Sequence, residues 1–295
     1  MFWAFFPLLT GQQPEEINLT NHPADDRYAS YSPDGTRIIF ESNRDGNWNI
    51  YLMDANGDHT QRLTTSDFDD RGPSWHPDGS KVIFESNRSG KYELYVLSIR
   101  NHKVTKVNVA LNDGEASFAR YSPDGKLIAF SIKTSEQETD ICIATAGGRK
   151  IRSLTNYRLR SYYPTWSPDG RTIAFFSRHE TGNTDDEIYR IDIDGSNKRR
   201  LTNWPNHNFC PMWSHDGNKI AYVTSMTDSR PEIYIMDASG KHQVRITYND
   251  EGDTLPSWSL DDRKLLFSGY RNGNYEICEL TLPNIEVHPH AKGQK

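Results

Sequence analysis

A short turn sequence recurs six times along the chain and constrains the fold more than any other feature. It reads Ser-Pro-Asp-Gly in three copies and differs at one or two positions in the others, and the copies begin at Ser32, His76, Ser122, Ser167, Ser214 and Ser259. Successive copies are 44, 46, 45, 47 and 45 residues apart, and an aromatic residue precedes each one. A fixed period of this length indicates a repeat architecture, so each copy marks one structural unit.

Each unit contains about four short apolar stretches separated by turn residues, which is the pattern of β-strands rather than helices. In the first unit we expect a strand that ends at Tyr31, the anchor turn, strands at 37–42 and 49–53 joined by the loop 43–46, and a last strand at 61–64. The sixth turn carries Asp262 in place of glycine. Aspartate tolerates the left-handed backbone region better than most residues, so we expect this turn to persist.

Four-stranded units of this length match the blades of a β-propeller. Five units end in a complete fourth strand, whereas the sixth stops near Leu280. The segment 15–20 at the other end of the chain carries the same Leu-Thr ending and supplies the missing strand. We therefore predict an all-β, six-bladed β-propeller of four-stranded antiparallel blades over residues 15–281, with the last blade closed by the N-terminal strand.

The repeat resembles the TolB-like six-bladed propeller family, whose blades carry a pattern close to W-S-P-D-G, F-x-S-x-R-x-G, E-I-Y and R-L-T. This chain shows the pattern at 166–170, 84–88, 187–189 and 200–202. The resemblance implies the propeller fold and says little about activity, because such propellers serve many functions. TolB itself has a further α/β domain before its propeller, whereas only fourteen residues precede the first strand expected here.

Composition limits the class of partner. The formal net charge is −6 and no basic tract occurs, which disfavours nucleic-acid binding. No apolar stretch approaches the length of a membrane span. The three cysteines lie in three different repeats and indicate no disulfide framework. We expect a monomer whose partner is a protein or an extracellular polymer.

The chain ends fall outside the repeat. Residues 1–14 form an apolar segment that we compare with the remnant of an export signal, although the basic region and the Ala-x-Ala-like cleavage site are missing. The alternative is an end that packs on a blade. Residues 282–295 form a C-terminal tail. Together with the family resemblance, the apolar segment leads us to expect a periplasmic or secreted protein, with the cytoplasm as the alternative.

The two faces of the predicted disc differ. The face formed by the anchor turns and the last turn of each blade is uniform, and we call it the turn face. The opposite face carries the longer second loop of each blade and the crossovers between blades, and we call it the loop face. Loops that differ among equal blades are where a repeat scaffold specialises, so we expect binding on the loop face.

Three aspartates lie six residues before their anchors in blades that are neighbours once the ring closes: Asp26, Asp70 and Asp253. Converging carboxylates suit a hard cation, and calcium is the cofactor that this arrangement would hold. The alternative is that each aspartate caps its turn, or pairs with Arg27 or Arg71. Arg44, Arg88, Arg178 and Arg271 recur in the second loops, and we expect them to make structural pairs with nearby Asn and Glu residues rather than bind ligand.

Opposite the expected acidic arc lie Arg158, Arg160 and His207, and with Arg27 and Arg71 they are the candidate ligand-binding residues. No Gly-x-Ser-x-Gly motif or helical histidine pair occurs, and we assign no catalytic residue. The first hypothesis is a non-catalytic binding module that presents its loop face to a protein or polymer. The second is a small metal-assisted enzyme of the lyase or lactonase type at the channel mouth, with His207 as general base.

Overall fold

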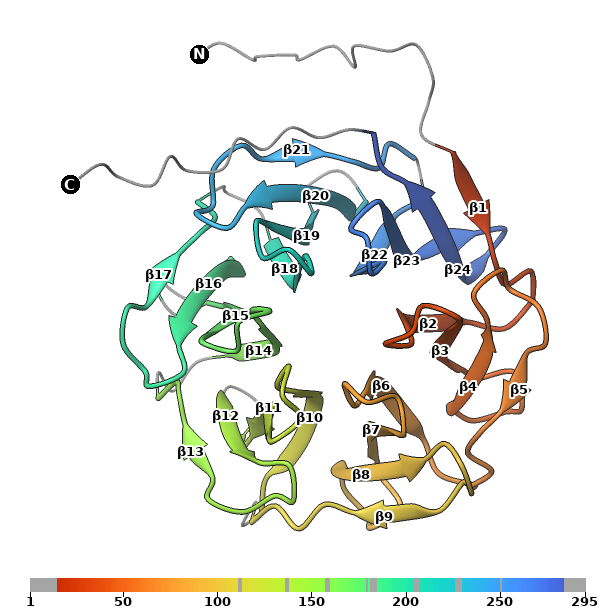
Figure 1. Ribbon diagram of the computed structural model, residues 1–295, viewed down its shortest axis with the longest axis horizontal. Helices are drawn as coiled ribbons and strands as arrows, with labels where there is room; N and C mark the ends of the chain where they lie inside the picture. Colours follow the sequence, from red (N-terminus) through yellow and green to blue (C-terminus); the bar gives the residue numbers. More distant parts are fainter. Residues whose placement is uncertain are drawn as a thin grey trace.

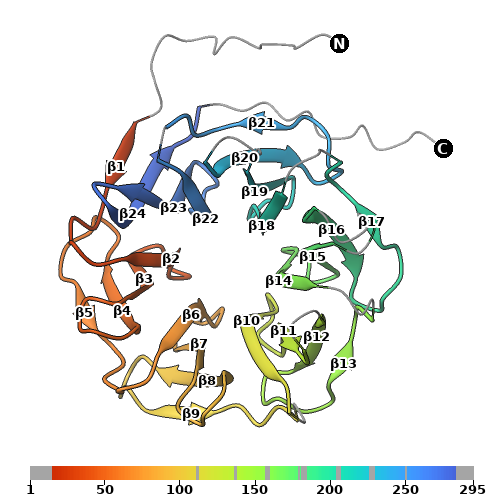
Figure 2. The same ribbon diagram turned by 180° about the vertical axis from the view of Figure 1, so that it is seen from behind.

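Short strands form six separate sheets around a central axis in the computed structural model (Figures 1 and 2). The structure describes residues 15–110, 113–135, 138–156, 160–178, 180, 185–203, 207–225, 230–249 and 251–283. Each sheet has four strands, and all its paired neighbours are antiparallel. The predicted all-β, six-bladed propeller is confirmed. The expected N-terminal segment 1–14 and, of the expected tail 282–295, residues 284–295 lie outside the described residues.

The strands of the first three blades follow one another outward from the centre of the ring. Blade one contains β2 (Asp26–Tyr31), β3 (Arg37–Ser42), β4 (Asn49–Asp54) and β5 (Gln61–Arg62). Blade two contains β6 (Asp70–Trp75), β7 (Lys81–Ser86), β8 (Glu93–Ser98) and β9 (Val104–Lys106). Blade three contains β10 (Glu115–Tyr121), β11 (Leu127–Lys133), β12 (Thr139–Thr145) and β13 (Arg152–Ser153).

The other three blades repeat this order. Blade four contains β14 (Ser161–Trp166), β15 (Thr172–Ser177), β16 (Glu187–Asp192) and β17 (Arg199–Arg200). Blade five contains β18 (His207–Trp213), β19 (Lys219–Ser225), β20 (Glu232–Asp237) and β21 (Val244–Arg245). Blade six contains β22 (Asp253–Trp258), β23 (Lys264–Arg271), β24 (Asn274–Thr281) and, from the other end of the chain, β1 (Glu16–Asn18).

The N-terminal strand closes the ring as predicted. β1 lies beside β24 at the outer edge of blade six, with Ile17 opposite Glu279 (Figure 1). Thr20 extends the contact, because its Oγ1 donates to Glu276 Oε2 at 2.6 Å and accepts the Ile277 N–H at 2.8 Å. The two ends of the repeat therefore hold one sheet together.

The anchor turns share one hydrogen-bond pattern. In the first turn the Ser32 hydroxyl donates to Asp34 at 2.6 Å and accepts the Arg37 N–H at 3.0 Å. The sixth turn has the same form: the Asp262 N–H donates to the Ser259 carbonyl at 2.9 Å, and Asp262 has a φ of 56°. The prediction that the sixth turn would persist with aspartate in place of glycine is confirmed.

The core lies in the seams between blades. Each seam packs apolar residues of two consecutive blades, and one aromatic per blade is almost completely buried: Phe40, Phe84, Phe130, Phe175, Tyr222 and Phe267. The seam between blades six and one joins Phe40 to Leu266 and Ile277, residues that are far apart in the sequence. Ring closure is therefore stabilised by apolar burial as well as by β1.

The three cysteines are buried free thiols, as the sequence indicated: Cys142, Cys210 and Cys278. Burial raises the pKa of all three thiols. Among the residues that the structure describes, no helix is long and apolar enough to cross a membrane.

Candidate binding site at the channel mouth

The innermost strand of every blade has a bulge at the same place. The pairing register with the second strand shifts there, for example between Arg27 and Ser30 in blade one. The residue four positions before each anchor has a positive φ of 51–60°, and these residues are Tyr28, Gly72, Phe118, Tyr163, Cys210 and Leu255. A left-handed backbone costs a residue with a side chain about 1–2 kcal/mol, so five blades accept strain at this point.

The bulge residues fill the centre of the ring. The ring centroids of Tyr28, Phe118 and Tyr163 lie 5.5–6.1 Å from one another, which is contact distance for aromatic side chains. Cys210 and Leu255 belong to the same apolar cluster. We call Tyr28, Phe118 and Tyr163 the channel plug. Blade two contributes only Gly72, which has no side chain to add.

A second position links four of the six bulges to the preceding blade, whereas Phe176 and Val223 occupy it before the other two. The residue nine positions after the anchor accepts the bulge N–H of the next blade: Glu41 accepts from Gly72 at 2.7 Å, and Glu85 from Phe118 at 2.8 Å. Ser268 and Ser131 make the same bond to Tyr28 and Tyr163, both at 3.3 Å. A hydroxyl is thus sufficient for this structural bond.

The hydrogen bond to the bulge therefore does not require the carboxyl groups of Glu41 and Glu85. Burial raises the pKa of Glu41 to about 7, although the Gly72 N–H and Arg71 act in the opposite direction. Burial raises the pKa of Glu85 to about 8, and the nearby Glu41 charge contributes to the rise. Buried carboxyls with strongly shifted pKa values are common at functional sites, because ordinary structural positions do not need them.

Two of the predicted ligand-binding residues lie beside these glutamates. The guanidinium carbons of Arg27 and Arg71 are 4.9 and 4.8 Å from the centre of the Trp48 ring. Arg27 also lies 4.4 Å from the Tyr275 ring and bonds Asp25 at 2.7 Å. The Nε atoms of both arginines are buried without a hydrogen-bond acceptor. We call Arg27, Trp48, Arg71 and Tyr275 the arginine mouth.

The three aspartates expected to hold calcium do not converge. Each is buried in its own blade and forms an ion pair there: Asp26 with Arg44 at 2.8 Å, Asp70 with Arg88 at 2.7 Å and Asp253 with Arg271 at 3.0 Å. Within the described ranges, no three His, Cys, Asp or Glu side chains are placed to share a metal ion. Calcium binding by these residues stays a prediction without support from this arrangement.

The ion pairs also correct the expected partners of the loop arginines. We expected Arg44 and Arg88 to pair with Asn49 and Glu93, whereas they pair with Asp26 and Asp70. The register explains the difference, because Asp26 lies opposite Ser42 and the loop arginine follows two residues later. Arg27 and Arg71, the expected alternative partners, bind the preceding aspartates Asp25 and Asp69 instead.

The remaining predicted ligand residues lie in blades four and five. His207 Nδ1 is 3.1 Å from Asp186, which also binds Arg178 at 2.7 Å. The Arg160 carbonyl accepts the Arg178 N–H at 3.3 Å, and Arg160 forms a parallel bridge with Thr139. Arg158 lies outside the described residues. No contact of Arg160 or His207 with the arginine mouth is observed within the described part of the chain.

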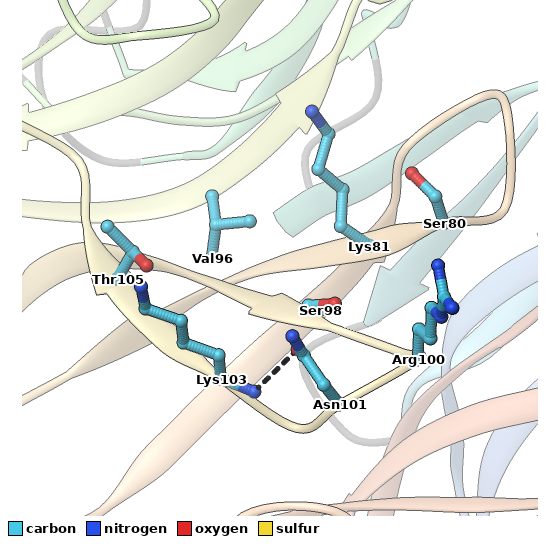
Figure 3. A pocket seen from close by; sticks show the side chains of 8 residues that line it. All are labelled: Ser80, Lys81, Val96, Ser98, Arg100, Asn101, Lys103 and Thr105. Atoms are coloured by element: carbon cyan, nitrogen blue, oxygen red, sulfur yellow. Dashed lines mark hydrogen bonds between the residues drawn. The ribbon is translucent and has the colours of Figure 1, made fainter.

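A separate basic groove lies on the turn face of blade two, with a volume of about 300 Å³. Figure 3 shows Lys81, Arg100 and Lys103 around it, with Ser98 between them. In blades one and five the position of Ser98 is occupied by Asp54 and Asp237. The cations of this groove lie on the opposite face from the arginine mouth, so substitutions there can serve as controls for the effect of net charge.

Sequence reasoning missed the channel plug, the two buried glutamates and Trp48. Aligning the blades on their anchors would have shown large apolar residues at the bulge position, and Glu41 and Glu85 where other blades have serine or apolar residues. Trp48 carries a similar signal, because the second loops of blades one, two and six have equal length and an aromatic at the same position: Trp48, Tyr92 and Tyr275.

Comparisons with known proteins agree with this architecture. A family model described as the TolB beta propeller domain matches residues 12–205 and 140–290. A TolB candidate from Agrobacterium tumefaciens is 21% identical with a TM-score of 0.73, over 92% of this chain and 98% of that chain. An oligogalacturonate lyase in complex with manganese is 17% identical with a TM-score of 0.63, over 92% of this chain and 98% of that chain. A gluconolactonase from Xanthomonas campestris is 10% identical with a TM-score of 0.68, over 92% of this chain and 90% of that chain.

At these identities the solved structures share the fold, and they include both a TolB candidate and enzymes. The family model covers nearly all of the repeat that the sequence defines. The chain belongs to the TolB beta propeller domain family.

Proposed function

We propose that this propeller is a binding module whose arginine mouth holds an acidic group of a protein or polymer partner. The observation that carries the proposal is the pair Arg27 and Arg71, both in contact with the Trp48 ring and each with a buried Nε that has no acceptor. A guanidinium matches a carboxylate in shape and charge, so the unused donors favour an anionic ligand. The Trp48 and Tyr275 rings fix the orientation of Arg27.

The experiment measures binding of two immobilised polyanions by biolayer interferometry. Poly-L-glutamate represents a protein partner and polygalacturonate a carbohydrate polymer, and uncharged dextran is the negative control. The double variant Arg27→Gln and Arg71→Gln should weaken binding of the preferred polyanion at least tenfold. The matched control, Arg100→Gln with Lys103→Gln, removes the same charge from the turn face and should change binding less than twofold.

The two outcomes separate specific from general charge effects. Equal weakening in both double variants would show that only net charge matters, and the proposal would fail. Failure of the wild type to bind either polyanion at low salt would also reject it. Because exposed charges are screened by salt, the comparison is made at one fixed ionic strength.

A second candidate, an enzyme acting at the same mouth, is favoured by one observation. Glu41 and Glu85 lie beside Arg71 with pKa values raised by burial to about 7 and about 8, which suits proton transfer near neutral pH. Polygalacturonate and gluconolactone are the substrates to assay, with and without added manganese. Turnover that disappears in the Glu85→Gln variant would favour this candidate over a binding module.

A further inference from the structure

The opposite end of the channel opens into a hollow of about 430 Å³ on the turn face. The repeat builds it, because each anchor places an aromatic residue and usually a proline at the same height in successive blades. Its wall includes Trp75, Trp166 and Trp213, and the prolines Pro33, Pro77, Pro123 and Pro168. We call this hollow the proline funnel. Its size lies within the range of ligand-binding pockets, about 300–1,000 Å³.

One tryptophan of the funnel wall lacks a hydrogen bond that the equivalent tryptophans of other blades make. The indole N–H of Trp75 donates to the Ser30 carbonyl at 3.3 Å, and that of Trp166 to the Arg120 carbonyl at 3.0 Å. The equivalent Trp213 Nε1 is buried without an acceptor. Thr165 Oγ1 is also unpartnered, as is Ser30 Oγ at the equivalent position of blade one. Unpaired buried polar atoms are uncommon in folded proteins, and the indole N–H of Trp213 lacks the partner that Trp75 and Trp166 have.

Arg120 lies where the funnel meets the channel. It lines the funnel and also a smaller cavity in the channel that Tyr28 and Tyr163 line. It occupies the position two residues before the anchor, where the other blades have Ser30, Ser74, Thr165, Met212 and Ser257. One of its terminal nitrogens donates to the Tyr163 hydroxyl at 2.9 Å, and its guanidinium carbon is 4.9 Å from the Tyr163 ring centre. Its Nε is buried without an acceptor.

Among the described residues, no acidic side chain forms an ion pair with Arg120. The lining of the funnel contains no aspartate or glutamate, and no carboxylate lies within 4.0 Å of Arg120 among the residues with described positions. The partly buried arginine therefore presents a positive charge, with donors to spare, at the base of an aromatic and proline-lined wall. A charge in such surroundings is normally paired, so its natural complement is an anion.

We propose that the proline funnel is a second binding site, for a small ligand with a flat or extended apolar body and one carboxylate that pairs with Arg120. The apolar body packs between the tryptophan and proline side chains. Trp213 Nε1 and Thr165 Oγ1 then supply the hydrogen bonds to polar atoms of the ligand. This site is separated from the arginine mouth by the channel plug, and it does not depend on the function proposed for that mouth.

The test compares an acid with its neutral analogue by isothermal titration calorimetry on the full chain. Naphthalene-2-acetate should bind at least tenfold more tightly than naphthalene-2-acetamide, because charge-assisted hydrogen bonds are stronger than neutral ones. Arg120→Gln should remove this preference while leaving weak binding of the amide. Arg120→Lys should restore part of it, and Thr165→Val should weaken both ligands.

Arg71→Gln at the other mouth is the matched control and should leave the preference unchanged. Equal affinities for acid and amide in the wild type would overturn the proposal, as would absence of binding at millimolar ligand. A preference that survives in Arg120→Gln, or disappears in Arg71→Gln, would place the anion elsewhere. If Arg120→Gln does not fold, the Arg120→Lys and Thr165→Val titrations still decide the matter, since unchanged binding in both rejects the site.

Discussion

Replacing Glu85 by glutamine should change how stability depends on pH. Glu85 is buried in the seam toward blade three, where its Oε2 accepts the Phe118 N–H at 2.8 Å. Its pKa rises from 4.5 to about 8, mainly because burial disfavours the charged form. The folded protein therefore retains this proton over a pH range in which the unfolded chain has lost it.

The sign and size of the effect follow from linkage. The raised pKa of Glu85 means that its contribution to the free energy of unfolding is fully present below pH 4.5. This contribution is lost as the pH rises from 4.5 to about 8. Each pKa unit corresponds to about 1.4 kcal/mol, so the loss from Glu85 between pH 5 and pH 8 is roughly 3–4 kcal/mol. For a domain of this size that corresponds to a decrease of about 5–7 °C in melting temperature.

The assay is thermal unfolding followed by circular dichroism at pH 5, 6, 7 and 8 in buffers of equal ionic strength. The amide of Glu85→Gln can still accept the Phe118 N–H, but it cannot ionise. The variant should match the wild type near pH 5 and melt several degrees higher at pH 8. Glu251→Gln, which changes an exposed glutamate, is the control and should follow the wild-type curve. Parallel curves for Glu85→Gln and wild type would refute the reasoning.

Two further predictions concern ring closure and metal. Gly57→Ala should lower the free energy of unfolding by about 1–3 kcal/mol more than Gly46→Ala in urea titrations, because overpacking adds to a similar backbone strain. A Cβ at Gly57 would lie 2.7 Å from the Leu19 carbonyl oxygen next to β1, whereas one at Gly46 would meet nothing within 4 Å; equal losses would contradict this account. We also expect the melting temperature to stay the same in millimolar calcium and in chelator, since Asp26, Asp70 and Asp253 are each paired with arginine. A calcium-dependent rise that Asp70→Asn abolishes would instead establish the calcium site.

The fold was predictable because its determinants are local and repeated. The anchor turns use a serine in five blades and His76 in the second, with an aspartate and a residue that accepts positive φ, and these can be read in the sequence even where Asp262 replaces glycine. The turns follow from hydrogen bonding within a few residues, which the order of amino acids specifies directly. The closing strand pairs with the far end of the chain, and it was predictable because it carries the ending that blade six lacks.

The candidate site was only partly predictable, because its contacts join different blades. Arg27 and Arg71 were named from the sequence as separate candidates, but their shared contact with Trp48 comes from a loop of blade one and was not expected. The aspartates were expected to face one another, and they turn instead toward the loop arginines of their own blades. Which way a side chain turns depends on the bulge in the innermost strand, and no turn motif in the sequence marks that bulge.

The positions that matter most at both ends of the channel are those where one blade differs from the others. The repeat uses its common residues to form turns, strands and seams, so these residues are already committed to the fold. Glu41 and Glu85 replace a hydroxyl that would make the same bond, and Arg120 replaces a small polar or apolar residue at the base of the funnel. Each substitution buries an ionisable group, which folding alone does not favour. Because the repeat offers a less costly residue at each position, these three side chains are the first to test by substitution for a role in ligand binding.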